Sequence, residues 1–405
     1  MRGVRHAGTG SATNGTAASD NHCVFPGNVA HPLSIPGQTA LARGSQIEGP
    51  PLPEGAAKSS IDSMSFSAEA YFASQPPPPT LQHDVEQVRE FVARQAKEGR
   101  NVVLVTSGGT TVPLELNVVR FLDNFSAGTR GATSAEYFLK AGYAVIFMHR
   151  QFSLQPFSRH YSHSTNPFLD FLEIDPPSPS SPDADPRISV TPNKRHDLLN
   201  VLTEYKRVHA LGTLHTLTFV TVDDYLWLLR ALSQELAVVG RRAMFYLAAA
   251  VSDFFLPRQK MSEHKIQSGK GNLSIEMDQV PKILKPLVDN WTKGGYVISF
   301  KLETDDNLLL PKARQALERY GHQVVIGNDL HRRKFEVVFV SKKYLPGPPP
   351  NPEPAADGSD EFSEYWLRIN VAHTNQTPGF PLKEIEEDIV AELVKRHAEW
   401  IARTP

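Results

Sequence analysis

The sequence predicts an α/β fold in three layers, with a mostly parallel sheet and helices packed on both of its faces. Short runs of consecutive apolar residues, such as Val102-Val103-Leu104-Val105, are typical of strands that are covered on both faces. These runs alternate with amphipathic helical segments, and such alternation indicates right-handed crossovers between parallel strands. Near the C-terminus, strand-like segments follow one another without an intervening helix, which predicts an antiparallel meander there.

The first patterned segment begins at residue 84. Val85, Val88 and Val92 lie on one face of the expected helix, Asp84 is its expected N-cap, and Gly99 ends it. The meander strands at the sheet edge are candidate dimer contacts. In chain order, the remaining expected elements are strand 102–105, helix 131–141, strand 144–147, helix 196–210, strand 215–221, helix 222–237, strand 244–251, helix 281–290, strand 296–301, helix 307–320, strand 323–327, strand 335–341, strand 365–371 and helix 382–401.

Proline marks the segments that are expected to lie outside the core. The 32 prolines concentrate in residues 1–80, 176–192 and 346–354. Because proline removes a backbone donor and blocks helix interiors, these stretches are expected to be loops or linkers. Residues 1–80 are expected to form a disordered or low-complexity N-terminal extension. Residues 81–405 are then expected to form a single α/β domain, with proline-rich insertions near 174–193 and 345–361.

Charge and cysteine content exclude several classes of protein. The net charge is −2, from 42 basic and 44 acidic side chains, so a strongly basic nucleic-acid surface is excluded as the main feature. The one cysteine, Cys23, excludes a disulfide framework and a cysteine-rich metal site, and it suits a reducing compartment such as the cytoplasm. The central apolar run 246–251 is far shorter than the ~20 residues that span a bilayer, so no membrane span is expected.

Two glycine-rich turns are candidates for anion binding. Gly108 and Gly109 follow the first strand in Thr106-Ser-Gly-Gly-Thr, where backbone N–H groups can approach an anion without side-chain obstruction. An ordinary tight turn explains this motif equally well. In the next turn, Gly128 and Gly131 precede a helix whose free N–H groups form a natural phosphate site. Asn124 lies just before that turn, with an amide that can donate to an acyl phosphate oxygen, although it can also bond nearby backbone groups.

Polar residues also follow several other strands. Small residues in Leu247-Ala-Ala-Ala-Val-Ser-Asp253 leave room for a flat ligand, and Asp253 can accept a hydrogen bond or hold a cation; otherwise the alanines pack against a helix and Asp253 caps the next segment. Lys265 lies in a loop, where lysine is usually solvated, but beside phosphates it would neutralise triphosphate charge. Phe300 and Asn328 lie at two further strand ends. We expect these strand ends to converge on one crevice.

The sequence lacks the common signatures of metal or nucleophilic catalysis. Its 15 histidines show no metal-ligand spacing, and neither a P-loop nor a Gly-x-Ser-x-Gly motif is present. Cys23 lies in the N-terminal extension and has no catalytic partners. An enzyme with this sequence would therefore work by positioning charge.

Six motifs occur along the chain in a specific order. They are Thr106-Ser-Gly-Gly-Thr, Arg120-Phe-Leu-Asp-Asn-Phe-Ser-Ala-Gly-Thr-Arg-Gly-Ala, Ala248-Ala-Ala-Val-Ser-Asp-Phe, Glu263-His-Lys-Ile-Gln, Val280-Pro-Lys-Ile-Leu and Ile298-Ser-Phe-Lys-Leu-Glu-Thr. In this order they resemble the motifs of the phosphopantothenate–cysteine ligases of eukaryotes, and the resemblance covers residues 70–405. The resemblance implies a catalytic domain with a modified Rossmann-like fold, a homodimer, and an activity in coenzyme A synthesis. A nucleoside triphosphate with Mg²⁺, generally ATP in eukaryotes and CTP in bacteria, would activate 4′-phosphopantothenate as an acyl-nucleotide, and L-cysteine would then form the amide.

The resemblance also implies roles for individual residues. Asn124 matches the asparagine that contacts the acyl group, and Lys265 matches the lysine that promotes acyl-nucleotide formation. Ala127 replaces the second serine of the family pattern Asn-x-Ser-Ser-Gly, which removes one hydroxyl donor. The positions that match contacts to the nucleotide or turns around the ligands are Gly108, Gly109, Gly128, Ala249, Asp253, Pro281, Lys282, Ile283, Leu284, Phe300 and Asn328.

Two other functions are compatible with an α/β fold of this kind. A nucleotide-dependent oxidoreductase needs a dinucleotide fingerprint after the first strand, and Ser107-Gly-Gly-Thr does not supply one. A non-catalytic nucleotide-binding protein would be favoured if changes at Lys265 and Asn124 left turnover unaltered.

Overall fold

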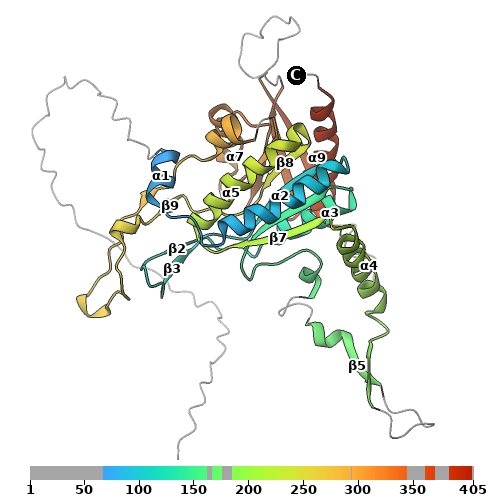
Figure 1. Cartoon of the computed structure of the whole chain (residues 1–405). Coiled ribbons are helices and arrows are strands. Elements are labelled where there is room, and N and C mark those ends of the chain that lie inside the picture. Colours follow the sequence, from blue (N-terminus) through green and yellow to red (C-terminus); the bar gives the residue numbers. More distant parts are fainter. Residues whose placement is uncertain are drawn as a thin grey trace, which may run out of the picture. The chain divides into compact units, whose positions relative to one another are not determined.

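An eight-stranded sheet forms the centre of the protein (Figure 1). The computed structural model describes residues 67–161, 167–175, 185–292, 294–343, 361–369 and 383–403, all within the compact unit Asp62–Pro405. The strand order is β14-β13-β12-β11-β8-β1-β4-β7. The bounds are β1 Val102–Ser107, β4 Ala144–Arg150, β7 Leu214–Phe219, β8 Ala243–Leu247, β11 Tyr296–Glu303, β12 Val324–Asp329, β13 Glu336–Lys342 and β14 Phe362–Arg368.

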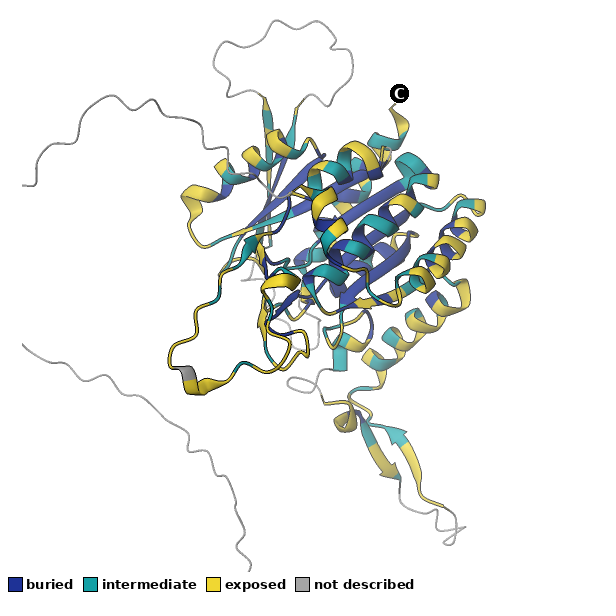
Figure 2. Cartoon of the chain, turned by 60° about the vertical axis from the view of Figure 1, so that its left-hand side comes forward, coloured by how far each residue is buried: buried dark blue, intermediate teal, exposed yellow. Residues whose placement is uncertain are grey.

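The pairing confirms the expected fold class. The six strands from β12 to β7 are parallel, whereas β13 pairs antiparallel with both β12 and β14. Strands β1, β4, β8 and β12 are buried on both faces over most of their length, which agrees with their largely apolar sequences. Figure 2 shows these buried strands between helices whose outer faces are exposed.

Helices cover both faces of the sheet. On one face, α2 (Leu81–Lys97) and α5 (Val222–Leu236) pack with α1 (Ala68–Ser74) in one hydrophobic cluster, and α7 (Asp306–Tyr320) packs on β12 and β13. On the other face lie α3 (Thr129–Lys140) and α9 (Ile385–Ala402), whereas α4 (Arg195–Leu211) buries only Val208. Three small antiparallel pairs lie outside the main sheet: β2 Thr111–Pro113 with β3 Phe121–Asp123, β5 Leu172–Asp175 with β6 Arg187–Val190, and β9 Phe254–Phe255 with β10 Asp278–Gln279. The remaining elements are the short helix α6 Leu284–Pro286 and the turns η1 Ser158–Tyr161, η2 Phe168–Phe171, η3 Ala237–Arg242, η4 Arg258–Lys260, η5 Ser268–Lys270 and η6 Leu287–Trp291.

The structure corrects the expected start of the folded domain. The segment 1–80 was expected to be a low-complexity extension, but α1 lies inside it. Ser67 caps this helix, and the side chain of Tyr71 is fully buried and donates a hydrogen bond to Asp223. Residues 1–66 lie outside the described residues, as does Cys23. The domain therefore begins at least 13 residues earlier than position 81, counting from Ala68.

Several expected boundaries are also wrong. Helix α2 begins at Leu81, so Asp84 lies in its first turn and is not its N-cap. The strand expected over 244–251 ends at Leu247. The helix expected over 281–290 is present but begins at Leu284, after Pro281, and continues from α6 without a break into the π-turn η6, which ends at Trp291. Part of the insertion expected near 174–193 forms the β5–β6 hairpin. The insertion near 345–361 lies almost wholly outside the described residues.

Candidate functional site

A cavity of about 800 Å³ opens at the carboxyl ends of β8, β11 and β12, where a parallel sheet is expected to bind ligands. The first turn of α3 and the segment that leads into α6 also line it. Ten of the residues singled out from the sequence line this cavity: Asn124, Gly128, Ala249, Asp253, Pro281, Lys282, Ile283, Leu284, Phe300 and Asn328. The structure therefore brings together five chain segments that are far apart in sequence.

Gly108 and Gly109 do not line the cavity, but they contact two segments that do. The N–H of Ala250 donates to the carbonyl of Gly108 at 2.8 Å, which joins the end of β8 to the turn after β1. A Cβ atom on Gly109 would lie 1.7 Å from the carbonyl oxygen of Asn124. Glycine at position 109 is therefore required for the Asn124 segment to pass so close to this turn.

The second glycine turn fixes the start of α3 at the cavity. Gly128 is the N-cap of α3, with φ at +81°, a conformation that favours glycine. The hydroxyl of Ser107 at the end of β1 donates to the Gly128 carbonyl at 3.0 Å, and the Gly128 N–H donates to the Ser126 hydroxyl at 3.3 Å. The N-terminal N–H groups of α3 consequently lie at the cavity, where an anion is favoured.

Asp253 and the residues after it form a second wall. The N–H of Val280 donates to the Asp253 carbonyl at 2.9 Å, and the N–H of Ser252 donates to the Thr110 hydroxyl at 2.9 Å. The segment that follows β8 is therefore bonded on one side to the segment 280–284 and on the other to Thr110, directly after the first glycine turn. The wall is mostly apolar, with Ile283 and Leu284 beside Leu226 and Leu229 of α5.

Charged residues surround the opposite part of the cavity. Arg130, in the first turn of α3, donates to Glu386 of α9 at 3.1 Å, and its Cζ atom lies 5.8 Å from the ring centroid of Phe300. Burial raises the pKa of the Glu386 carboxyl, and the charge of Arg130 opposes this rise. Lys282, Lys301, Arg333 and Lys334 add positive charge to the lining.

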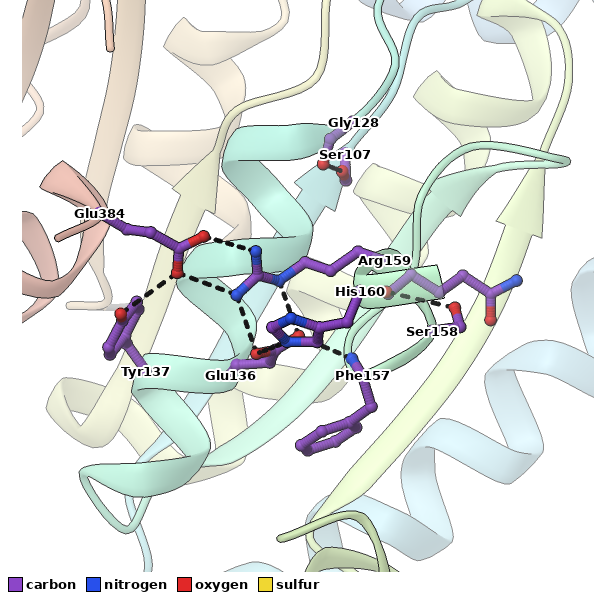
Figure 3. A network of polar contacts seen from close by, with 10 residues as sticks. Ser107, Gly128, Glu136, Tyr137, Phe157, Ser158, Arg159, His160 and Glu384 are labelled. Carbon is purple, nitrogen blue, oxygen red and sulfur yellow. Dashed lines mark hydrogen bonds and ion pairs between the residues drawn. The ribbon is translucent and has the colours of Figure 1, made fainter. Parts of the chain in front are cut away.

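A half-buried cluster of charges connects α3 and α9 (Figure 3). Arg159 of η1 forms ion pairs with Glu136 of α3 at 2.8 Å and with Glu384 at the start of α9 at 2.6 Å. Tyr137 and His160 complete the cluster, through hydrogen bonds to Glu384 and Glu136 respectively. Because Glu384 precedes Glu386 by two residues, this cluster also holds the partner of Arg130 in place.

Lys265 is not part of the cavity lining in a single chain. It lies in an exposed loop that is attached to the β2–β3 connection, where Leu116 donates to the Ser262 carbonyl at 2.9 Å and Arg120 donates to the Ile266 carbonyl at 2.6 Å. The sequence predicts that Lys265 acts in the same site as Asn124, and this stays a prediction.

Several lining residues were not singled out from the sequence. Arg130 and Lys301 lie inside the motifs and could have been recognised from the surrounding residues. Ser299 also lies inside a motif, beside Phe300. Glu386 and Tyr320 carry no local signal, because their positions depend on α9 and α7 packing beside the cavity. Within the described ranges, no group of three or more His, Cys, Asp or Glu side chains could hold a metal ion, and no helix is long and apolar enough to cross a membrane.

The mostly parallel sheet and the cavity at its carboxyl edge define an α/β protein with a Rossmann-like ligand site. A model of the DNA/pantothenate metabolism flavoprotein C-terminal domain matches residues 211–343. The phosphopantothenate–cysteine ligase CAB2 of Saccharomyces cerevisiae is 40% identical over 357 residues, which are 83% of this chain and 87% of the relative. The human phosphopantothenate–cysteine ligase is 47% identical over 331 residues, 81% of this chain and 96% of the relative.

A solved structure gives the same result. The structure of a Cab2 mutant in complex with phosphopantothenate-cysteine matches with a TM-score of 0.68 and 40% identity, over 82% of this chain and 98% of that chain. The chain therefore belongs to the phosphopantothenate–cysteine ligase family, and it is an enzyme of that type.

Proposed function

We propose that this enzyme uses ATP to join 4′-phosphopantothenate to L-cysteine through an acyl-adenylate intermediate. The observation that carries the proposal is the convergence of the motif residues around one cavity that has an anion-favouring helix N-terminus on one side and an apolar wall on the other. The human and yeast relatives are named for the same pair of substrates.

The proposed reaction has two steps. The carboxylate oxygen of phosphopantothenate attacks the α-phosphorus of ATP, the bond from that phosphorus to the bridging oxygen breaks, and pyrophosphate leaves. The cysteine amine then attacks the acyl carbon, loses a proton, and displaces AMP. Both steps need phosphates and an acyl group to be held and their charge to be stabilised, and neither needs a covalent bond to the enzyme.

The chain supplies groups suited to this chemistry. The N–H groups of the first turn of α3, with Arg130 and Arg333 nearby, favour bound phosphates. Asn124 lies at the cavity beside this turn, where its amide would contact the acyl phosphate. Lys265 would stabilise charge as pyrophosphate forms, after movement of its loop or from a second subunit.

Mg²⁺ is expected to enter with the nucleotide. This ion typically keeps several waters and is held by one or two carboxylates together with substrate phosphates, so it does not require a cluster of acidic ligands. Asp253 lines the cavity and is the candidate carboxylate, because the other lining carboxylate, Glu386, is paired with Arg130. When bound, Mg²⁺ would neutralise phosphate charge.

We also infer a homodimer and a cytoplasmic location. The β2–β3 hairpin and its connection expose a group of large apolar side chains near the loop of Lys265: Leu116, Val118, Val119, Phe121 and Leu122. Such a patch favours contact with another protein surface, and a second copy would bring another Lys265 loop with it. Light scattering on the purified protein tests the dimer, and a fluorescent fusion tests the location.

The ligation assay tests the proposal as a whole. Purified protein with ATP, Mg²⁺, phosphopantothenate and cysteine should form the amide product, and pyrophosphate release should require phosphopantothenate. A parallel assay with CTP measures nucleotide preference. Asn124→Asp should still consume ATP but accumulate acyl-adenylate, whereas Lys265→Gln should be blocked before pyrophosphate release. The absence of amide product with either nucleotide would refute the proposed function.

A further inference from the structure

A buried serine–histidine pair lies at the wall of the cavity and has no role in the reaction described above. The hydroxyl of Ser299 on β11 lies 2.8 Å from Nε2 of His322, which precedes β12. His322 is 1% exposed, and its Nδ1 atom has no hydrogen-bond partner among the described residues. A buried polar atom without a partner is rare and needs an explanation.

Ser299 faces the apolar side of the cavity. On β11 it is two residues from Val297, which belongs to the hydrophobic cluster with α5, and its neighbour on β8 is Leu247 of the same cluster. Side chains alternate along a strand, so Phe300 points to the other face, where its ring contacts Tyr246. The Ser299 hydroxyl is therefore a polar group on a wall formed with Ile283 and other apolar side chains.

The histidine determines what this hydroxyl can offer. Burial lowers the pKa of His322 to about 4, so the ring is neutral at neutral pH and carries one N–H. Buried N–H groups without a partner are rarer than buried acceptors without one, so the hydrogen belongs on Nε2 and Nδ1 keeps its lone pair. His322 then donates to the Ser299 oxygen, and the hydroxyl hydrogen of Ser299 is left for a ligand.

We propose that Ser299, positioned by His322, donates a hydrogen bond to an acceptor atom of the nucleobase and thereby helps to select the nucleotide. This inference rests on the proposed use of ATP. A flat base suits the apolar wall, while the triphosphate suits the charged part of the cavity near α3. A few placed polar groups on an otherwise apolar wall are the usual source of ligand specificity.

A purely structural role for the pair is the alternative. The bond joins β11 to the turn between α7 and β12, and Gln323 makes a similar connection by accepting from the Val297 N–H at 2.7 Å. A structural role predicts lower thermal stability without any change in the response to the base. The experiment must therefore measure how activity depends on the structure of the nucleobase, and not only the total activity.

The test compares ATP with its 1-deaza, 3-deaza and 7-deaza analogues, each of which lacks one acceptor nitrogen. Values of kcat/KM are measured for the wild-type enzyme, Ser299→Ala, His322→Phe and His322→Gln. For the wild-type enzyme, kcat/KM with one of the analogues should be roughly tenfold lower than with ATP, as expected for one lost hydrogen bond. This decrease is the penalty of that analogue. For Ser299→Ala and His322→Phe, kcat/KM with ATP should fall by a similar factor, and the difference between ATP and that analogue should disappear. His322→Gln retains an N–H near the position of Nε2 and should retain the penalty.

The control is Ser134→Ala, which removes another buried serine hydroxyl, one that lies 2.8 Å from the Tyr246 hydroxyl outside the cavity lining. This variant should show the wild-type pattern with every analogue. Equal deaza penalties in Ser299→Ala and the wild-type enzyme would overturn the inference while leaving the proposed function intact. A wild-type enzyme that shows no turnover with ATP would instead overturn the proposed function, and the inference with it.

Discussion

Arg130 donates a hydrogen bond to Glu386 at 3.1 Å, and this contact joins the first turn of α3 to the first turn of α9 at the wall of the cavity. The same guanidinium donates to the Arg333 carbonyl at 2.5 Å and lies over the Phe300 ring. Arg130 therefore fixes three cavity segments that come from distant parts of the chain.

Arg130→Met should weaken nucleotide binding. The substitution keeps an apolar stem but removes both hydrogen bonds and leaves Glu386 buried without its partner. We expect KM for ATP to rise by about tenfold or more, as for the loss of one charged hydrogen bond. Steady-state kinetics with saturating phosphopantothenate and cysteine measures this effect.

Arg368→Met is the matched control for this change. Arg368 also lies over an aromatic ring, that of Trp366, and pairs with Glu336, but it is outside the cavity lining. Its KM for ATP should equal that of the wild-type enzyme. An equal rise in both variants would show that Arg130 has no special effect on the nucleotide.

Glu136 should make the protein sensitive to acid. Burial alone would raise the pKa of its carboxyl, but hydrogen bonds from His160 and Arg159 and their charges outweigh burial and lower the pKa to about 2 from 4.5. The folded state therefore binds fewer protons here than the unfolded state, and this contribution to stability is present above pH 4.5 and lost as the pH falls toward 2.

Urea unfolding at a series of pH values measures this contribution. The free energy of unfolding of the wild-type protein should fall more steeply between pH 4.5 and pH 3 than that of Glu136→Gln, which is expected to be less stable at neutral pH. Parallel curves for the two proteins in the acid range would contradict the role given to Glu136.

Gly109→Ala should reduce activity more than stability. The added methyl group would lie 1.7 Å from the Asn124 carbonyl oxygen, so the segment that carries Asn124 must move. We expect kcat to fall on the order of a hundredfold, because small displacements of a positioned group have large effects on rate. Gly269→Ala, where the new methyl group meets nothing within 4 Å and φ is not positive, should keep wild-type kcat. A normal kcat for Gly109→Ala would mean that the position of Asn124 is not critical.

The start of the folded domain can be tested by truncation. Removal of residues 1–66 should leave turnover and thermal stability unchanged. Removal of residues 1–80 also removes Tyr71 and Phe72, whose buried aromatic side chains stabilise the fold by roughly 3–6 kcal/mol together. Differential scanning calorimetry should therefore show a clear loss of stability only for the longer deletion. Equal stability of the two truncated proteins would mean that α1 does not stabilise the domain, and that the domain begins at residue 81 as the sequence predicts.

The fold class could be read from the sequence because its signals are local. Buried strands such as β1 are continuous apolar runs, and the glycines that shape the cavity stand at fixed offsets from strand ends. Helix α1 was missed because its seven residues lie in a proline-rich stretch, and what stabilises it is the distant contact of Tyr71 with Asp223. A helix was expected after Pro281, but its π-turn over Leu287–Trp291 was not, because apolar spacing alone does not reveal a π-turn.

The residues of the candidate site could be predicted from the sequence where, as for the fold, the signal is local. Residues at strand ends, such as Ala249 and Phe300, converge because the topology of a parallel sheet requires it. Glu386 and the contact between Ser299 and His322 could not be predicted, since they depend on the packing of α9 and on the turn before β12. Lys265 illustrates the opposite case, because its motif is clear but a single chain does not bring it to the cavity.

The central claim is that the reaction proceeds through an acyl-adenylate, and the most direct test of it follows the carboxylate oxygen atoms of phosphopantothenate. Phosphopantothenate labelled with oxygen-18 in its carboxylate is incubated with the enzyme, ATP, Mg²⁺ and cysteine, and the nucleotide product is analysed by mass spectrometry. An acyl-adenylate requires one labelled oxygen to remain on AMP, with none in pyrophosphate. Formation of ADP with the label in orthophosphate would show an acyl phosphate instead, and the proposed mechanism would be wrong.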